Sequence, residues 1–329
     1  GVRLLVVSDR LPPRVRSGAG SVLDELCAQA GGDWSVERLT LPADEGPLAR
    51  SQGEIAVRRA LSKGPDAVIT LGPSITAAVP VFRLLDGRHA ERQTGGGLLG
   101  GLRRRVRQTR ARQEIGLVPT AASRALYRAP HAQVVPTGID TARFAPSGTT
   151  RDQGPLRLLF LGRLVPTRGA HAAIEAVLGL PGWALDGLEL EVVGAAEDAS
   201  YLDGLRRRAE DAPVRFVPNP ADVLPHLLRA DLAVLPSTAE DGWGRAILEA
   251  MSCGVPVVHS RGGVLDAITG DAGVGVAAGN LKPLGETLRK LLRKPDALPA
   301  LGQAGREHVL RNHSWDVVLP RWRAALGSG

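Results

Sequence analysis

Short apolar runs alternate with longer stretches of helical spacing along the whole chain. In the first half the apolar runs lie at 3–8, 34–41, 66–72, 79–85, 114–120 and 132–138, and in the second half at 156–162, 188–194, 214–218, 231–236, 254–260 and 273–277. Apolar positions recur at helical spacing between many of them, for example at 22–30 and 53–63. Strands that alternate with helices are typical of parallel sheets covered by helices, so the pattern predicts an α/β fold.

The strand and helix pattern restarts after a polar stretch rich in Pro and Gly at 145–155. A chain of 329 residues can bury two cores, one in each half. We therefore predict two Rossmann-like domains, an N-terminal one over 1–147 and a C-terminal one over 148–314. The helical pattern at 315–326 is expected to pack back on the first domain.

Composition indicates a soluble cytoplasmic protein. Hydrophobic residues make up 43% and charged residues 23% of the chain, with no apolar run near the roughly 18 to 20 residues of a membrane-spanning helix. The first residues, GVRLLVVSDR, lack the basic flank and cleavage site of a signal peptide. Cys27 and Cys253 are the two cysteines, and we expect both to be free thiols in a reducing compartment.

The charge balance favours an anionic partner. The 41 basic residues exceed the 34 acidic ones by seven, and lysine occurs only at 63, 282, 290 and 294. Such a balance suits a phosphate-containing ligand or an anionic membrane face, although a genome rich in Arg codons would also raise the arginine content. Aromatic residues are only 3% of the chain, and we see no nucleic-acid-binding motif. We therefore expect no nucleic-acid partner.

The stretch 231–253 has the layout of a ligand site in an α/β sheet. A strand at 231–236 leads through a polar turn into a helix that is predicted to run from Gly244 to Cys253. Gly242 and Gly244 let the backbone approach a ligand closely, and a helix start favours an anion. Glu249 lies within this otherwise apolar helix and needs a hydroxyl or a cation as partner, so it binds a ligand or pairs with a neighbouring arginine.

Two arginines follow the first strand of the second half. Arg163 comes directly after the strand at 156–162, and Arg168 precedes Gly169 at the start of the next helix. Both cations can reach the same edge of the sheet. Together with a helix N-terminus they form the elements of a diphosphate clamp.

These residues resemble the motifs of glycosyltransferase family 4, whose members are retaining enzymes of the GT-B fold. Gly162, Arg163, Arg168 and Gly169 match the motif after the first strand, with Arg168 in place of the usual Lys. Asp241 and Glu249 match a pair of acids at the family's spacing, and EAMSCGVPVV continues the match. The resemblance is strongest over 156–280 and implies two Rossmann-like parallel-sheet domains that face a cleft.

The resemblance also implies roles for individual residues. Glu249 would bind the ribose hydroxyls, and Asp241 would bind a hydroxyl of the donor sugar, with Glu240 as a rival for that role. Arg163 and Arg168 would neutralise the diphosphate. The backbone of 242–246 would contact sugar and phosphate. The donor site would thus be lined by Gly18, Gly162, Pro218, Asn219, Gly242, Trp243, Gly244, Arg245, Ala246 and Glu249, with Glu240 as the rival acid.

The catalytic step that the resemblance implies needs neither a general base nor a metal. The leaving phosphate would take the acceptor proton on the same face, and we see neither an Asp-x-Asp motif nor a metal-ligand spacing of histidines. The family's usual His near the anomeric carbon aligns with Asp86, and His89 follows three residues later. We assign His89, Asp241, Arg163 and Arg168 to catalysis and expect no cofactor.

The stretch 95–113 joins a glycine tract to a helical pattern rich in arginine. Through 98–112 such a helix can lie on an anionic membrane or receive a phosphorylated acceptor. A solvated helix with its leucines packed inward is the simpler alternative.

The sequence therefore predicts a retaining glycosyltransferase that moves a sugar from a UDP- or GDP-sugar to a hydroxyl of a small-molecule or lipid-linked acceptor. Two alternatives stay open: a nucleotide-sugar epimerase of the same architecture, and a basic nucleotide- or nucleic-acid-binding protein without turnover. The nucleotide base, the sugar, the acceptor and the oligomeric state do not follow from the sequence.

Overall fold

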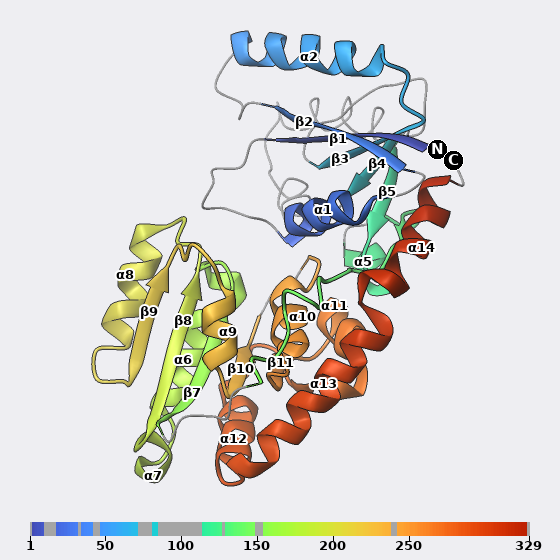
Figure 1. Ribbon diagram of the computed structural model, residues 1–329. Coiled ribbons are helices and arrows are strands. Elements are labelled where there is room, and N and C mark those ends of the chain that lie inside the picture. The colour runs from blue at the N-terminus through green and yellow to red at the C-terminus, as the bar shows by residue number, and fades with distance from the viewer. Residues whose placement is uncertain are drawn as a thin grey trace. The chain divides into compact units, whose positions relative to one another are not determined.

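The computed structural model describes residues 2–9, 18–31, 34–41, 47–71, 81–84, 114–126, 129–148, 154–237 and 242–327. The chain divides into two compact units, Gly1–Gly138 with Trp315–Gly329 and Ile139–Ser314. Each unit contains one parallel six-stranded sheet with helices beside it (Figure 1). The predicted α/β class, with two Rossmann-like parallel-sheet units of the GT-B type, is confirmed.

The sheet of the first unit has the strand order β2-β1-β3-β4-β5-β6. The central strands form because their residues are apolar at successive positions, as parallel strands covered on both faces require. Val6, Val7 and Val68 are almost fully buried there. The strands are β1 (Val2–Asp9), β2 (Trp34–Leu41), β3 (Ala67–Leu71), β4 (Val81–Leu84), β5 (Glu114–Val118) and β6 (Gln133–Val134), and the helices are α1 (Gly18–Gln29), α2 (Pro47–Leu61) and α5 (Ala121–Leu126).

The sheet of the second unit has the order β12-β11-β10-β7-β8-β9, so β7 lies between β10 and β8. Its strands are β7 (Leu156–Leu161), β8 (Leu188–Gly194), β9 (Val214–Pro218), β10 (Leu232–Leu235), β11 (Val257–Ser260) and β12 (Val274–Val276). Its α-helices are α6 (Ala170–Leu178), α7 (Gly182–Leu185), α8 (Ala199–Arg208), α9 (Leu224–Arg229), α10 (Arg245–Ser252), α11 (Gly263–Thr269), α12 (Leu281–Leu292) and α13 (Leu298–Asn312). Short 3-10 helices are η1 (Pro166–Arg168), η2 (Gly270–Ala272) and η3 (Pro295–Ala297).

The main core of the second unit lies between one face of this sheet and helices α6, α8 and α12. Phe160, Leu190 and Val192 point from the strands into this core, where Ile174 and Leu288 meet them from α6 and α12. Alternate residues of a strand point to opposite faces, so this set occupies the even-numbered positions of β7 and β8. The odd-numbered positions face the side that carries α9.

The segment 139–147, which we predicted to end the first domain, packs with the second unit instead. The boundary therefore lies after Gly138 and not after residue 147. Phe144 is the anchor: its side chain is 1% exposed, and its carbonyl accepts hydrogen bonds from Ser252 Oγ at 2.5 Å and Arg306 Nη1 at 3.2 Å. Sequence pattern alone placed the boundary in the polar stretch because this anchor consists of a single aromatic residue in an irregular segment.

The last helix, α14 (Trp315–Gly327), belongs to the first unit. Trp315 Nε1 donates to Glu25 on α1 at 2.8 Å, and Trp322 Nε1 donates to the Pro136 carbonyl at 2.9 Å. Both indoles are buried, so their N–H groups need these acceptors. The last helix of the chain is thereby part of the same unit as the first strand.

The predicted strands all appear in the two sheets, with ends that shift by a few residues. The run 132–138 is the one most shortened, because only Gln133–Val134 pair with β5. Val135 still donates its N–H to Val118, but the chain then turns toward α14. There Gly138 lies against Trp315: a Cβ on this glycine would be 2.6 Å from the indole ring.

The close approach of Gly138 to Trp315 generates a stability prediction. Gly138→Ala should destabilise the first unit by about 1 to 3 kcal/mol, because the added methyl overpacks a rigid ring. Gly31→Ala is the matched control, since nothing lies within 4 Å of a Cβ at that position. Thermal and urea unfolding of both variants is the measurement. Equal midpoints for Gly138→Ala and the wild type would contradict the close packing.

Candidate functional site

The candidate site lies at the carboxyl ends of the strands in the second unit. Strand order reverses between β10 and β7, because the chain adds β8 and β9 on one side of β7 and β10 to β12 on the other. Ligands of open α/β sheets bind at such a reversal, where two loops diverge. The loops after β7 and β10 carry both predicted motifs, so the topology brings the two motifs together.

The loops after β7, β8 and β9 are joined through their backbones. Gly162 donates its N–H to Val193 at 3.0 Å, and a Cβ on Gly194 would lie only 1.7 Å from the Gly162 carbonyl oxygen. Asn219 donates its N–H to the Gly194 carbonyl at 2.8 Å and has a left-handed φ of 53°. Its side-chain oxygen accepts from Ala196 at 3.1 Å. Asn219, which was predicted only to line the donor site, therefore also fixes the shape of this edge.

The loop after β7 is also fixed against the loop after β10. Gly169 follows η1 with φ of 78°, and a Cβ there would lie 2.1 Å from the Pro236 carbonyl oxygen. Ser237 Oγ donates to the Thr167 carbonyl at 3.0 Å. Glycine is required at 169 for both the left-handed conformation and the contact. The N-terminus of α6 is held beside the end of β10 as a result.

The two predicted phosphate-binding arginines differ in their surroundings. Arg163 is 22% exposed, and its Nη1 lies 3.6 Å from Glu197 Oε1 in the loop after β8. Arg168 ends η1 and is half-buried. Glu197 was not among the predicted site residues. Its position three residues beyond a strand end was the available signal, but a single acid in a polar loop has no motif around it.

Helix α10 begins as predicted, with Gly244 at its N-cap and a left-handed φ of 62°. A Cβ at Gly244 would lie 2.3 Å from Ile268 Cδ1, so the position admits only glycine. Gly242 and Trp243 precede it, and the Trp243 side chain is 1% exposed. The indole is part of the core, which leaves the backbone of this segment as the surface that a ligand can meet.

Glu249 has a cation partner on its own helix. Arg245 Nη2 donates to Glu249 Oε1 at 3.1 Å, with side chains that are 8% and 13% exposed. The Arg245 guanidinium also lies 5.8 Å from the centre of the Phe144 ring. Of the two partners that the sequence left open for Glu249, the neighbouring arginine is therefore present. The ion pair fixes the Glu249 carboxylate about one turn after the start of α10.

The start of α11 contributes a third fixed turn to the same unit. Asp266 accepts the Gly262 N–H at 2.6 Å, so this acid stabilises the glycine turn before its own helix. Behind it His259 is 1% exposed, and burial lowers the pKa of its imidazole. Thr269 Oγ1 lies 3.1 Å from His259 Nε2. This neutral histidine supports α11 from the core.

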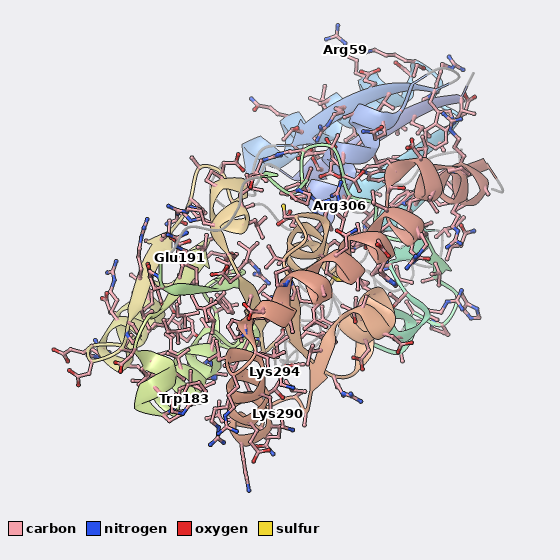
Figure 2. The ribbon with its side chains drawn as sticks, turned by 60° about the horizontal axis from the view of Figure 1, so that its bottom comes forward. Arg59, Trp183, Glu191, Lys290, Lys294 and Arg306 are labelled. Carbon is pink, nitrogen blue, oxygen red and sulfur yellow. The ribbon has the colours of Figure 1, made fainter. Side chains whose placement is uncertain are left out.

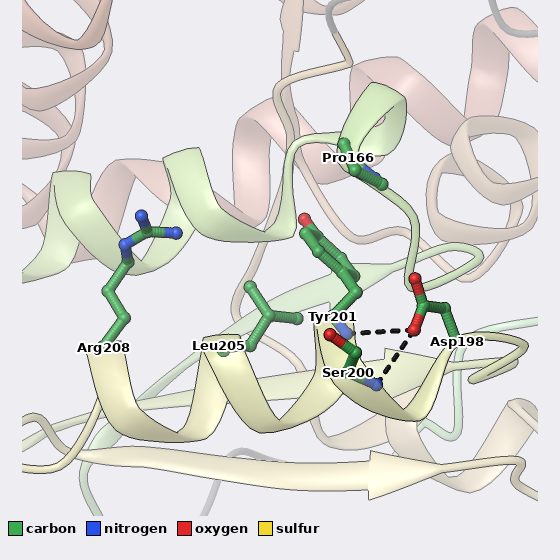
Figure 3. Close-up of a pocket in the computed structure, with 7 residues that line it drawn as sticks. Pro166, Asp198, Ser200, Tyr201, Leu205 and Arg208 are labelled. Carbon is green, nitrogen blue, oxygen red and sulfur yellow. Dashed lines mark hydrogen bonds between the residues drawn. The ribbon is translucent and has the colours of Figure 1, made fainter.

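A surface cavity of about 320 Å³ lies beside η1, between Pro166 and the face of α8 that carries Tyr201, Leu205 and Arg208 (Figure 3). Asp198 caps α8 by accepting the N–H groups of Ser200 and Tyr201, as the dashed lines show. The Tyr201 hydroxyl lies 3.1 Å from His171 Nδ1, and burial raises the pKa of Tyr201. The Asp198 carboxylate is thus already bonded to backbone N–H groups. The side chains that the cavity offers to a ligand are mainly Tyr201 and Arg208.

Several predicted residues cannot be located in this site. Asp241, Glu240, His89 and Asp86 lie outside the described residues, as does the segment 98–112. Gly18 is the first residue of α1 in the other unit. The loops described above bring together Gly162, Arg163, Arg168, Pro218, Asn219, Gly242, Trp243, Gly244, Arg245, Ala246 and Glu249 at the carboxyl edge of one sheet or on the helix that follows it.

Among the residues that the structure describes, no group of three or more His, Cys, Asp or Glu side chains is arranged to hold a metal ion. No helix in this part of the chain has the length and apolarity that crossing a membrane requires. Cys27 and Cys253 are free, as expected, and burial raises the pKa of the Cys253 thiol to about 12.

The buried pair of Arg245 and Glu249 generates a prediction for stability. Arg245→Met should lower the free energy of unfolding by about 3 kcal/mol, because it leaves a largely buried carboxylate without its counter-charge. Arg245→Met combined with Glu249→Gln should recover part of the loss in urea unfolding. The control is Arg311→Met, which removes an exposed pair with Glu307 of the same spacing and should cost about 0.5 kcal/mol or less. Equal losses for the two single variants would contradict the role of burial.

The second unit resembles proteins of known function. Residues 155–294 match the family model described as glycosyl transferases group 1. Glycogen synthase of Mycobacterium tuberculosis is 34% identical over 190 residues, which cover 56% of this chain and 45% of that protein. A GDP-mannose-dependent alpha-(1-6)-phosphatidylinositol monomannoside mannosyltransferase of Mycolicibacterium smegmatis is 33% identical over 234 residues, 64% of this chain and 57% of that one. The chain thus spans about half the length of the curated relatives it matches.

Solved structures match the fold of the whole chain. HepE of Anabaena, in complex with UDP and glucose, has a TM-score of 0.81 at 18% identity, with 100% of both chains covered. Sucrose-phosphate synthase of Thermosynechococcus elongatus has a TM-score of 0.80 at 18% identity, again with 100% of both chains covered. At this identity the likeness concerns the fold alone. Residues 155–294 thus resemble the glycosyl transferases group 1 family, and the loops that carry the predicted motifs lie at the carboxyl edge of the sheet in this segment.

Proposed function

We propose that the protein is a retaining glycosyltransferase that transfers a sugar from a UDP- or GDP-sugar to a hydroxyl of its acceptor. The observation that carries this proposal is the locked edge of the second unit, where the arginine loop after β7 meets the end of β10. The Ser237–Thr167 hydrogen bond and the contact of Gly169 with Pro236 hold that edge together. The family match of 155–294 supports the same class of reaction.

The diphosphate of the donor would lie at this edge. Arg163 and Arg168 supply two cations. The residue before each of the helices α6 and α10 is a glycine, which has no side chain to cap the first N–H groups of the helix. Helix N-termini and guanidinium groups both favour phosphate oxygens. Negative charge grows on the leaving diphosphate as the glycosidic bond to it breaks. Fixed donors that already point at that charge lower the barrier without reorganisation.

Glu249 would accept hydrogen bonds from the ribose hydroxyls of the donor. A carboxylate that makes such bonds has to be held in one orientation. Arg245 holds it, because it pairs with Glu249 from one turn earlier at 3.1 Å. Arg245 is therefore a positioning residue for Glu249, in addition to the backbone role that we predicted for it.

The remaining roles rest on the sequence resemblance. Asp241, with Glu240 as its rival, would bind a hydroxyl of the donor sugar, and His89 would lie near the anomeric carbon. The leaving phosphate would take the acceptor proton on the face from which it departs, with no metal and no other cofactor. The residues 1–147 would bind a small-molecule or lipid-linked acceptor, and 98–112 would contact an anionic membrane from the cytoplasmic side.

The relatives make a nucleotide-sugar donor a reasonable first choice. Four of them are described as GDP-mannose-dependent mannosyltransferases, and HepE was solved with UDP-glucose. They differ in base and sugar, so the base has to be found by experiment. A nucleotide-sugar epimerase would bind the same ligands but would release an epimerised nucleotide sugar, and a polynucleotide-binding protein would turn over neither.

Nucleotide binding is the first consequence to test. One of UDP, GDP, ADP and dTDP should stabilise the wild type by roughly 2.7 kcal/mol at about 100 times its dissociation constant. Glu249→Gln and Arg163→Gln should each lose most of that shift in thermal unfolding. Glu307→Gln is the control, because Glu307 is an exposed acid on α13. If no nucleotide shifts the wild type, or if Glu307→Gln loses the shift equally, the donor site is not where we place it.

The stereochemistry of transfer tests the mechanism. With the matching nucleotide sugar and a simple alcohol or sugar acceptor, the first product should keep the anomeric configuration of the donor, because the acceptor attacks on the leaving group's face. Proton NMR during early turnover reads the anomeric coupling directly. An inverted first product would exclude same-face attack, and an epimerised nucleotide sugar without transfer would favour the epimerase.

A further inference from the structure

One tryptophan of the second unit differs from all the others. Trp183 on α7 is 48% exposed, whereas Trp34, Trp243, Trp315 and Trp322 are each 9% exposed or less. The chain has five tryptophans, so Trp183 is the single indole at the surface. Burial of an indole contributes a large hydrophobic free energy, so a tryptophan left in water suggests a surface that another body covers.

Cations surround this indole. The Arg293 guanidinium lies 5.6 Å from the centre of the Trp183 ring, which joins α7 to the end of α12. Lys290 and Lys294 lie at the same end of the unit as Trp183 (Figure 2). We call this surface the α7–α12 patch. It consists of Trp183, Arg289, Lys290, Arg293 and Lys294, all of which are exposed.

The distribution of lysine sets the α7–α12 patch apart from the rest of the surface. Only four of the 41 basic residues are lysines, so 41 − 4 = 37 are arginines. Two of the four lysines, Lys290 and Lys294, lie in the patch, whereas Lys282 lies in the first turn of α12 at the other end of that helix. A general preference for arginine in the chain does not account for two lysines four residues apart.

The helix dipole explains the patch only in part. Cations near a helix C-terminus gain about 0.3 to 1 kcal/mol from the dipole, and α12 ends at Leu292. However, Arg289 with Arg293, and Lys290 with Lys294, are like charges four residues apart, which repel each other by a similar amount. Asp186, Glu286 and Asp296 lie close by in the sequence, so the four cations of the patch exceed these acids by one. Neither effect accounts for the exposed indole.

We propose that the α7–α12 patch is a docking surface for an anionic lipid membrane. An indole inserts at the level of the lipid headgroups, while lysine and arginine side chains extend to the phosphates beside it. A soluble polyanion without aromatic rings, such as polyphosphate, would need the cations but would gain little from Trp183. The patch is separate from the segment 98–112 in the sequence and belongs to the other unit, so the two contacts are independent.

Vesicle binding of the whole protein tests this directly. The wild type should co-sediment with phosphatidylcholine vesicles that contain phosphatidylglycerol, less well as salt rises, and should not co-sediment with pure phosphatidylcholine. Brominated acyl chains in the anionic vesicles should quench part of the tryptophan fluorescence, and Trp183→Phe should remove that quenching. Because the other four indoles are buried, the signal reports this position. No nucleotide is needed, so the result is independent of the proposed transferase activity.

Variants distinguish the patch from general attraction. Lys290→Gln/Arg293→Gln/Lys294→Gln should weaken vesicle binding at least about tenfold, since each cation near an anionic surface contributes about 1 kcal/mol. Arg58→Gln/Arg59→Gln/Lys63→Gln is the control: it removes three exposed positive charges, two in the last turn of α2 and one just after it that pairs with Glu37, and should bind like the wild type. Equal binding by both triple variants overturns the proposal. So does vesicle binding that falls with the cations but not with Trp183→Ala, because it would show charge attraction without insertion of the indole.

Discussion

The candidate site depends on one constraint, the close approach of backbones at the carboxyl edge of the second sheet. Gly169 lies so near the Pro236 carbonyl that no side chain fits between them, and Gly194 approaches Gly162 in the same way. These contacts fix three loops that diverge from neighbouring strands. Helix starts and cations on those loops then have defined positions relative to one another, which a ligand with two phosphates requires. Any side chain added at these glycines would move the loops before it affected the core.

The same edge explains why charge is tolerated where the sheet is otherwise apolar. Arg163 is held near Glu197, and Arg245 pairs with Glu249, so each cation has a fixed anionic neighbour in the protein alone. A carboxylate beside a guanidinium limits how far that guanidinium moves when a phosphate arrives. Charge that is held in place before a ligand binds becomes useful for catalysis when the ligand develops charge beside it.

Much of this could be predicted from sequence, and the misses have physical causes. The strands were predictable because their apolar runs are short, β-branched and regularly spaced, and the start of α10 because Gly242 and Gly244 precede an amphipathic turn. The domain boundary was missed because Phe144, an isolated aromatic residue in an irregular segment, binds through its carbonyl to Ser252 and Arg306 far along the chain. Glu197 and the αL conformation of Asn219 are tertiary features that no local pattern encodes.

Arg245 shows why two interpretations of one residue need not compete. From sequence, Glu249 either pairs with a neighbouring arginine or binds a ligand, and the structure shows the pair. A side chain on the first turn of a helix and one four residues later share a face, so Arg245 holds Glu249 from the side nearer the helix start. That is also the side from which an anionic ligand would approach. An ion pair that stabilises the empty helix can thus be the element that orients the carboxylate for a hydroxyl, and the structural role is then a condition of the functional one.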